Sequence, residues 1–275
     1  MLEPSASLAP ERDSRGRKKL TDLSSFGAPE AGRPRRGVRL LRPGFNLPTL
    51  GAVLFLWVQI WVELSGGVVL EGGDLHPVYH AFATSWHFLT EGKIWGLFSH
   101  QFLHGSWGHV GLNSLVFYYA AARLGHLLRP IKVILLFGVC GMIAATVHTA
   151  AQAVFPGLPA GPLVGASGGI MGLFLAQTVL YPDSRMLLLP VSGRNMGKGV
   201  LTASLLLFLI TPGLGLPGFA AVGRTAVSFL GESLFQIAHL YHFVGGVMGM
   251  LLVERLLPRL VSLEDLKRER VRNET

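Results

Sequence analysis

Polar side chains that are capable of nucleophilic chemistry occur in three separate apolar stretches of the chain. Ser167 lies in the run Gly165-Ala-Ser-Gly-Gly-Ile-Met-Gly172, and His242 lies near the start of a later stretch. His109 and Asn113, four residues apart in an earlier stretch, share one face of a helix. A serine hydroxyl is a weak nucleophile until a base takes its proton, and imidazole has a suitable basicity near neutral pH. The pattern therefore predicts acyl transfer with Ser167 as nucleophile and a histidine of the later stretch, His242 or His239, as base.

The tetrahedral intermediate of acyl transfer carries an oxyanion, which needs hydrogen-bond donors that are already in place. The backbone N–H of Ser167, the Asn113 amide and the His109 ring are the donors that we expect. Since no Asp or Glu occurs near Ser167 or His242 in these three stretches, the sequence predicts a Ser-His dyad without a third acidic member. His239 precedes His242 by one turn and remains an alternative base.

The composition of the 275-residue chain is typical of a membrane protein. Half of the residues are apolar and 15% are charged, whereas about a quarter are charged in ordinary soluble domains. The net charge of +8 would suit a nucleic-acid binder, but such a protein would not be this apolar, so we expect no nucleic-acid partner. A single cysteine, Cys140, excludes an internal disulfide framework, and no cofactor motif is found.

Six stretches approach the roughly 20 apolar residues that cross a bilayer. We therefore expect an all-α membrane protein with a six-transmembrane-helix bundle and a long amphipathic first loop, Glu71 to Gly108. The expected spans are Thr49–Leu70, His109–Leu128, Ile131–Phe155, Leu163–Tyr181, Gly199–Ala221 and Phe235–Leu257.

The flanking segments are charged. Residues 1–48 predict a basic, mostly disordered cytoplasmic arm, residues 49–257 the membrane domain, and residues 258–275 a charged cytoplasmic tail. With this topology, 22 of the 24 Lys and Arg residues fall on one side, and only Lys93 and Arg224 fall on the other. The positive-inside rule then places both termini in the cytoplasm.

The three motifs together resemble those of the rhomboid intramembrane serine proteases. His100-Gln-Phe-Leu-His104-Gly-Ser-Trp-Gly-His109-Val-Gly-Leu-Asn113 is similar to the second-helix signature of that family. Gly165-Ala-Ser167-Gly168 resembles its nucleophile motif, and His242-Phe-Val-Gly245-Gly-Val-Met-Gly249 resembles its last-helix motif. The likeness runs from about Trp95 to Leu252, with the motifs in the expected order.

The resemblance implies a serine endopeptidase of the bacterial inner (plasma) membrane. It would cleave single-span or other transmembrane protein substrates near the outer face of the lipid bilayer, with Ser167 and His242 catalytic and His109, Asn113 and Ser167 in the oxyanion hole. Two positions depart from the family pattern. Gly96 stands where an arginine often follows the loop tryptophan, and Met171 stands where an aromatic residue commonly packs on the catalytic histidine.

Two other functions are consistent with parts of the sequence. One is a catalytically inactive rhomboid-like protein that binds membrane clients. The other is a metal site or transporter, because histidine is a common metal ligand. Its candidate ligands are His100, His104, His109, His239 and His242.

Overall fold

The computed structural model describes residues 46–70, 73–159, 161–186, 190–231, 235 and 237–257. Its contacts divide the chain into a unit Met1–Arg42 and a unit Pro43–Thr275, and every described residue belongs to the second. The predicted tail and all but residues 46–48 of the predicted arm lie outside the described residues.

The described part of the chain is helical and contains no strand, which agrees with the all-α class expected from the sequence. Only isolated β-bridges occur in it. The longer helices are α1 (Leu47–Leu64), α5 (Trp107–Leu124), α6 (Pro130–Val154), α7 (Ser167–Leu180), α8 (Gly193–Leu209), α9 (Phe219–Leu230) and α11 (His239–Leu256). The shorter ones are α2 (Pro77–Phe82), α3 (Trp86–Thr90), α4 (Gly96–Ser99), η2 (His100–Phe102) and η3 (Pro212–Leu214).

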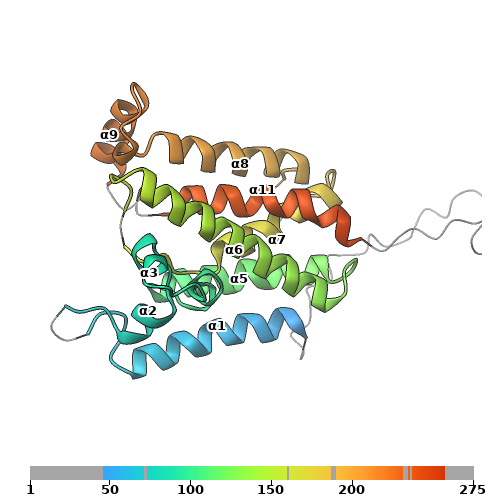
Figure 1. The fold of residues 1–275 in the computed structure, drawn as a ribbon. Helices are drawn as coiled ribbons and strands as arrows, with labels where there is room; N and C mark the ends of the chain where they lie inside the picture. The colour runs from blue at the N-terminus through green and yellow to red at the C-terminus, as the bar shows by residue number, and fades with distance from the viewer. Residues whose placement is uncertain are drawn as a thin grey trace, which may run out of the picture. The chain divides into compact units, whose positions relative to one another are not determined.

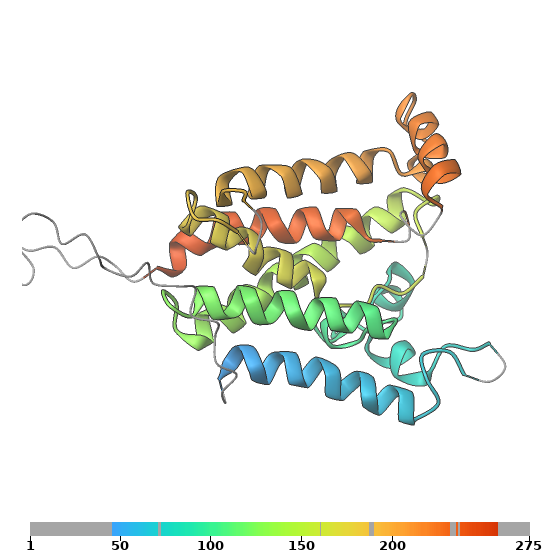
Figure 2. The same ribbon diagram turned by 180° about the vertical axis from the view of Figure 1, so that it is seen from behind.

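The long helices form a bundle around α7, which contacts α5, α6, α8 and α11 (Figures 1 and 2). The side chains of α7 are buried from Gly168 through Thr178 except at Met171, so this helix is the centre of the bundle. In contrast, α1 buries a single stripe, with Phe55 against Phe117 of α5.

Glycines allow the backbones of α7 and α11 to touch. A Cβ atom on Gly245 would overlap the carbonyl of Gly168, and one on Gly249 would overlap the carbonyl of Gly172. Small residues spaced four apart are a common means of close helix packing in membranes. The glycine spacing in the two motifs therefore holds the two helices that carry Ser167 and His242 in direct contact.

Local capping residues set where several helices begin. The Asn46 side chain accepts a hydrogen bond from Thr49 N–H at 3.1 Å, and Ser106 Oγ accepts one from His109 N–H at 3.2 Å. Ser and Asn are favoured at this position because they satisfy N–H groups that lack a helical partner. The Ser106 cap places His109 in the first turn of α5.

Four expected spans differ from the observed helices mainly at their ends. The first helix ends at Leu64 and not at Leu70, because Gly66 and Gly67 take positive φ angles of 121° and 83°. The second is α5, which ends at Leu124, and the third is α6, which matches within a residue. The last begins at His239 and not at Phe235.

The expected fourth and fifth spans were wrong in more important ways. Helix α7 begins only at Ser167, because Leu163 pairs with Thr84 of the first loop and Gly165 takes a positive φ of 114°. Helix α8 begins at Gly193 and ends at Leu209, ahead of Thr211-Pro212. The remainder of the expected fifth span forms η3 and the separate helix α9.

By length and composition, two of the described helices, α1 and α6, are apolar enough to cross a membrane. The helices α7 and α9 are also apolar but shorter, with 14 and 12 residues. Helices α5, α8 and α11 carry polar residues, among them the candidate site residues, which lower their hydropathy.

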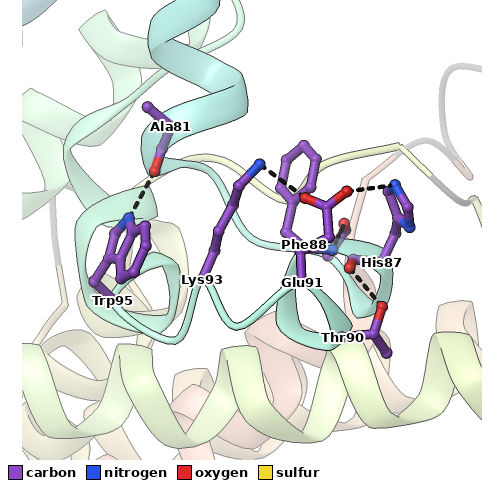
Figure 3. Close-up of polar contacts among 8 residues, drawn as sticks. Ala81, His87, Phe88, Thr90, Glu91, Lys93 and Trp95 are labelled. Carbon is purple, nitrogen blue, oxygen red and sulfur yellow. Dashed lines mark hydrogen bonds and ion pairs between the residues drawn. The ribbon is translucent and has the colours of Figure 1, made fainter.

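The first loop is a series of short helices tied together by polar contacts (Figure 3). Trp95 Nε1 donates to the Ala81 carbonyl at 2.7 Å. Glu91 forms an ion pair with Lys93 at 2.8 Å, and its other carboxylate oxygen lies 3.1 Å from His87 Nε2. The Lys93 ammonium lies 4.7 Å from the Phe88 ring centre. The hydrogen bond from Lys93 lowers the pKa of Glu91. The Glu91–Lys93 ion pair is therefore fully present above the ordinary carboxyl pKa and is lost as the pH falls through the lowered pKa of Glu91.

Candidate active site

Ser167 and His242 are in hydrogen-bond contact across the α7–α11 interface. Their Oγ and Nε2 atoms are 2.7 Å apart, although the residues are 75 positions apart in the chain. Ser167 is the first residue of α7, and His242 lies in the first turn of α11. For Nε2 to accept the serine proton, the imidazole must carry its own proton on Nδ1.

The segment before Ser167 is held by the first loop. Leu163 and Thr84 exchange backbone hydrogen bonds of 2.6 and 3.2 Å, and Gly165 N–H donates to the His100 carbonyl at 3.0 Å. Gly165 has a φ of +114°, which residues with a side chain rarely adopt. This turn starts α7 at Ser167, whose backbone N–H therefore has no carbonyl partner within the helix.

His109 and Asn113 lie beside this turn, as the sequence predicts. A Cβ atom on Gly165 would overlap the His109 ring and would lie 3.6 Å from Asn113 Nδ2, so the missing side chain allows these groups to lie close to the Gly165 turn. Asn113 Nδ2 is buried and has no hydrogen-bond acceptor among the described residues. A buried donor without an acceptor lowers the free energy of unfolding. Its presence here is consistent with a donor that binds the oxyanion formed during the reaction.

The residue next to His242, Tyr241, was not anticipated from the sequence. Its ring is fully buried against Gly168, where a Cβ atom would overlap it. Its hydroxyl lies 3.0 Å from the Gly165 carbonyl and 2.9 Å from His100 Nε2. Tyr241 therefore joins α11, the nucleophile turn and the first loop at one point.

His100 links the first loop to α11 through the Tyr241 hydroxyl. Its Nδ1 contacts the Gly96 carbonyl at 2.9 Å, and burial lowers the pKa of its ring to about 4, so the ring is neutral near pH 7. A neutral imidazole has one N–H, which the Gly96 carbonyl requires. The single hydroxyl hydrogen of Tyr241 is then shared between His100 Nε2 and the Gly165 carbonyl. His104 contacts the second helix, α5, where its ring packs on His109 with a centroid separation of 5.0 Å.

The structure explains one of the two departures from the family pattern. A Cβ atom on Gly96 would overlap the carbonyl of Ala83, so no larger residue fits at this position of the loop. The adjoining Trp95 is still anchored through its indole N–H. Met171, the other departure, is the one partly exposed residue between Gly168 and Thr178 of α7.

The alternative base His239 has a different environment from His242. Its buried ring packs edge-on against Phe235, with a centroid separation of 6.5 Å.

The distribution of possible metal-ligand side chains also bears on the metal-site alternative. Among the described residues, no three His, Cys, Asp or Glu side chains are grouped so that they could hold a metal ion.

The comparison with known families agrees with the motifs. The family model described as Rhomboid domain matches residues 91–259, which is more than half of the chain and includes every residue of the candidate site. The chain therefore belongs to the rhomboid family of membrane proteins, whose members are generally intramembrane serine proteases. The comparison with curated proteins gave no match.

Proposed function

We propose that this protein is an active intramembrane serine endopeptidase that uses a Ser167–His242 dyad. The observation that carries the proposal is the 2.7 Å contact between Ser167 Oγ and His242 Nε2. At this distance the imidazole can take the hydroxyl proton as the oxygen attacks a substrate carbonyl. No ion pair of His242 with an Asp or Glu is found in the part of the chain that the structure describes, which fits a dyad. In this dyad Tyr241 and the glycine contacts hold the two helices in place of a third member.

The remaining steps use the groups around the Gly165 turn. The oxyanion of the tetrahedral intermediate is stabilised by the Ser167 N–H, Asn113 Nδ2 and His109. His242 then gives its proton to the leaving amine, and a water molecule hydrolyses the acyl-enzyme by the reverse sequence of proton transfers.

In the proposed topology, α1, α5, α6, α7, α8 and α11 cross the membrane and both termini are cytoplasmic. The length of α7 supports a site below the outer surface. Its 14 residues span about 21 Å, less than the roughly 30 Å hydrocarbon core, so Ser167 starts inside the bilayer. The non-helical residues before it are tolerated there because the first loop forms hydrogen bonds with the backbone of Leu163 and Gly165. Water reaches the site from the outer side.

The experiment that tests the proposal is covalent labelling. The purified wild-type protein in detergent is treated with a fluorophosphonate probe, and the modified peptide is mapped by mass spectrometry. We expect labelling at Ser167 in the folded protein and none after denaturation, because only the hydrogen-bonded serine is activated. Failure of the folded protein to label, with membrane clients still bound, would instead favour an inactive rhomboid-like protein. Cleavage that requires an added metal and stops with a chelator would favour the metal alternative.

The nature of the substrate follows from the chemistry at the site. A stable helix hides its carbonyl carbons from attack, so the substrate span must unwind near the scissile bond. A single-span substrate with glycine near the outer end of its span is expected to be cleaved faster than the same substrate with an all-leucine span. The two are compared as initial rates of product formation on gels. Equal rates would contradict the need for unwinding.

Tyr241→Phe removes one hydroxyl at the junction of the three segments and keeps the ring. We expect fluorophosphonate labelling of Ser167 to slow by about tenfold, because small displacements of a reacting group cost up to about 100-fold. The loss of this buried hydrogen bond also lowers the free energy of unfolding by about 1–3 kcal/mol. Rates are therefore measured well below the melting temperature of each protein.

Tyr181→Phe is the matched control for this substitution. The Tyr181 hydroxyl contacts the Arg123 carbonyl at 3.4 Å, at the other end of α7. We expect its labelling rate to equal that of the wild type. Equal rates for Tyr241→Phe and the wild type would show that the hydroxyl does not position the nucleophile turn.

A further inference from the structure

We propose that α9 is an interfacial helix whose exposed apolar side chains insert into the outer leaflet of the bilayer. The inference rests on the proposed membrane crossing of the bundle helices. It concerns the segment between α8 and α11, which the sequence placed partly within the fifth span. The side chains concerned are Phe219, Val222, Phe229 and Leu230, and all four are exposed.

The residues of α9 separate into three faces at helical spacing. Ala220 and Gly223 are buried, and a Cβ atom on Gly223 would overlap the carbonyl of Ile210, so this face lies on the protein. The second face holds the four exposed apolar residues. The third carries Arg224, Thr225 and Ser228, which are exposed and polar.

An exposed apolar stripe beside a polar stripe is typical of a helix that lies in a membrane interface. The apolar exposure is large, because 83% of Phe229 and 67% of Leu230 are accessible in the chain alone. Exposure of this apolar stripe to water would cost free energy, since removing apolar surface from water contributes about 25 cal/mol per Å². The proposed partner is therefore lipid.

The position of α9 in the bundle fits this partner. Both views show α9 at the end of the bundle that also holds α2 and α3, crosswise to α8 and reaching past it (Figures 1 and 2). A helix crosswise to a membrane-spanning helix runs along the membrane surface. The lipid that surrounds the outer end of α8 is then directly next to α9.

The charged residue of α9, Arg224, is also consistent with a position in the membrane interface. Arg224 borders a cavity of about 440 Å³ that is also lined by Thr211, Val227 and Phe235. No ion pair of Arg224 is found within the described residues. An arginine at the interface can extend its guanidinium to the lipid headgroups while its stem stays on apolar surface. Exposed Trp86 is the first residue of α3, which lies at the same end of the bundle (Figure 1), and tryptophan is a typical interface residue.

Site-directed spin labelling tests the inference. The only cysteine, Cys140, is buried, so a Cys140→Ala background leaves no native site to label. Nitroxides are attached to Val222→Cys and Phe229→Cys on the apolar face, and to Thr225→Cys and Ser228→Cys on the polar face. Each protein is reconstituted into vesicles of phosphatidylcholine and phosphatidylglycerol. Collision rates with oxygen and with a water-soluble nickel chelate are then measured.

We expect labels at Val222 and Phe229 to collide with oxygen and to lose nickel collisions, consistent with a depth of about 5–10 Å in the interface. Labels at Thr225 and Ser228 should show the reverse. Equal nickel collision rates on both faces would overturn the inference. So would spin–spin broadening at Phe229, which would indicate a second copy of the chain on this face.

A label at Leu115→Cys separates failure of this inference from failure of the proposed topology. Leu115 is exposed near the middle of α5, so it should be in the hydrocarbon core. Nickel access at Phe229 with none at Leu115 would overturn the role of α9 alone. Nickel access at both positions would overturn the membrane crossing of α5 as well, and with it the inference about α9.

Discussion

Replacing His242 with alanine is expected to reduce substrate cleavage by about 10²–10⁴-fold, the usual contribution of a general acid–base group. The imidazole that accepts the Ser167 proton at 2.7 Å would be lost, so the hydroxyl would no longer be activated. Fluorophosphonate labelling of Ser167 should fall in the same proportion, because it requires the same proton transfer. Both rates are measured on purified protein, with Ser167→Ala as the background.

His239→Ala is the matched comparison, since it removes a histidine from the same helix one turn away. Its ring packs on Phe235, and the glycine spacing of the last-helix motif starts from His242. We expect this variant to keep much of the wild-type rate. Loss of activity in His239→Ala with retention in His242→Ala would reassign the base.

The second large effect is expected from a single methyl group, in Gly249→Ala. The added Cβ atom would overlap the carbonyl oxygen of Gly172, and a backbone carbonyl cannot rotate away as a side chain can. Helices α7 and α11 must then separate, at a cost of about 3 kcal/mol, the upper end for overpacking. The midpoint of thermal unfolding in detergent should fall. Labelling of Ser167 should also fall, because α11 carries His242 away from α7.

Gly199→Ala on α8 is the control for the effect of the methyl group itself. No atom lies within 4 Å of a Cβ atom at this position, so only the backbone preference changes. We expect stabilisation by roughly 0.5–1 kcal/mol, because alanine favours helices more than glycine. An equal loss of stability in both variants would show that close α7–α11 contact is not the cause.

The sequence predicted the helices better than their ends. Apolar stretches of span length and caps such as Ser106 depend on residues close in the chain, so they can be read directly. The start of α7 at Ser167 could not be read in this way. It depends on Leu163 pairing with Thr84, a residue of the first loop. The expected fifth span also takes in the first three residues of α9, although Pro212 and Pro217 are visible breaks.

The candidate site shows the same division. The motifs alone supply the reactive groups of Ser167, His242, His109 and Asn113, and the small residues that let their helices approach. The packed helices were needed to see that Ser167 and His242 are in contact, that Tyr241 joins His100 to the Gly165 turn, and that Gly96 faces a carbonyl. Motifs and helical periods carry information about residues that are close along the chain. A contact between residues 75 or 141 positions apart depends on how whole helices pack.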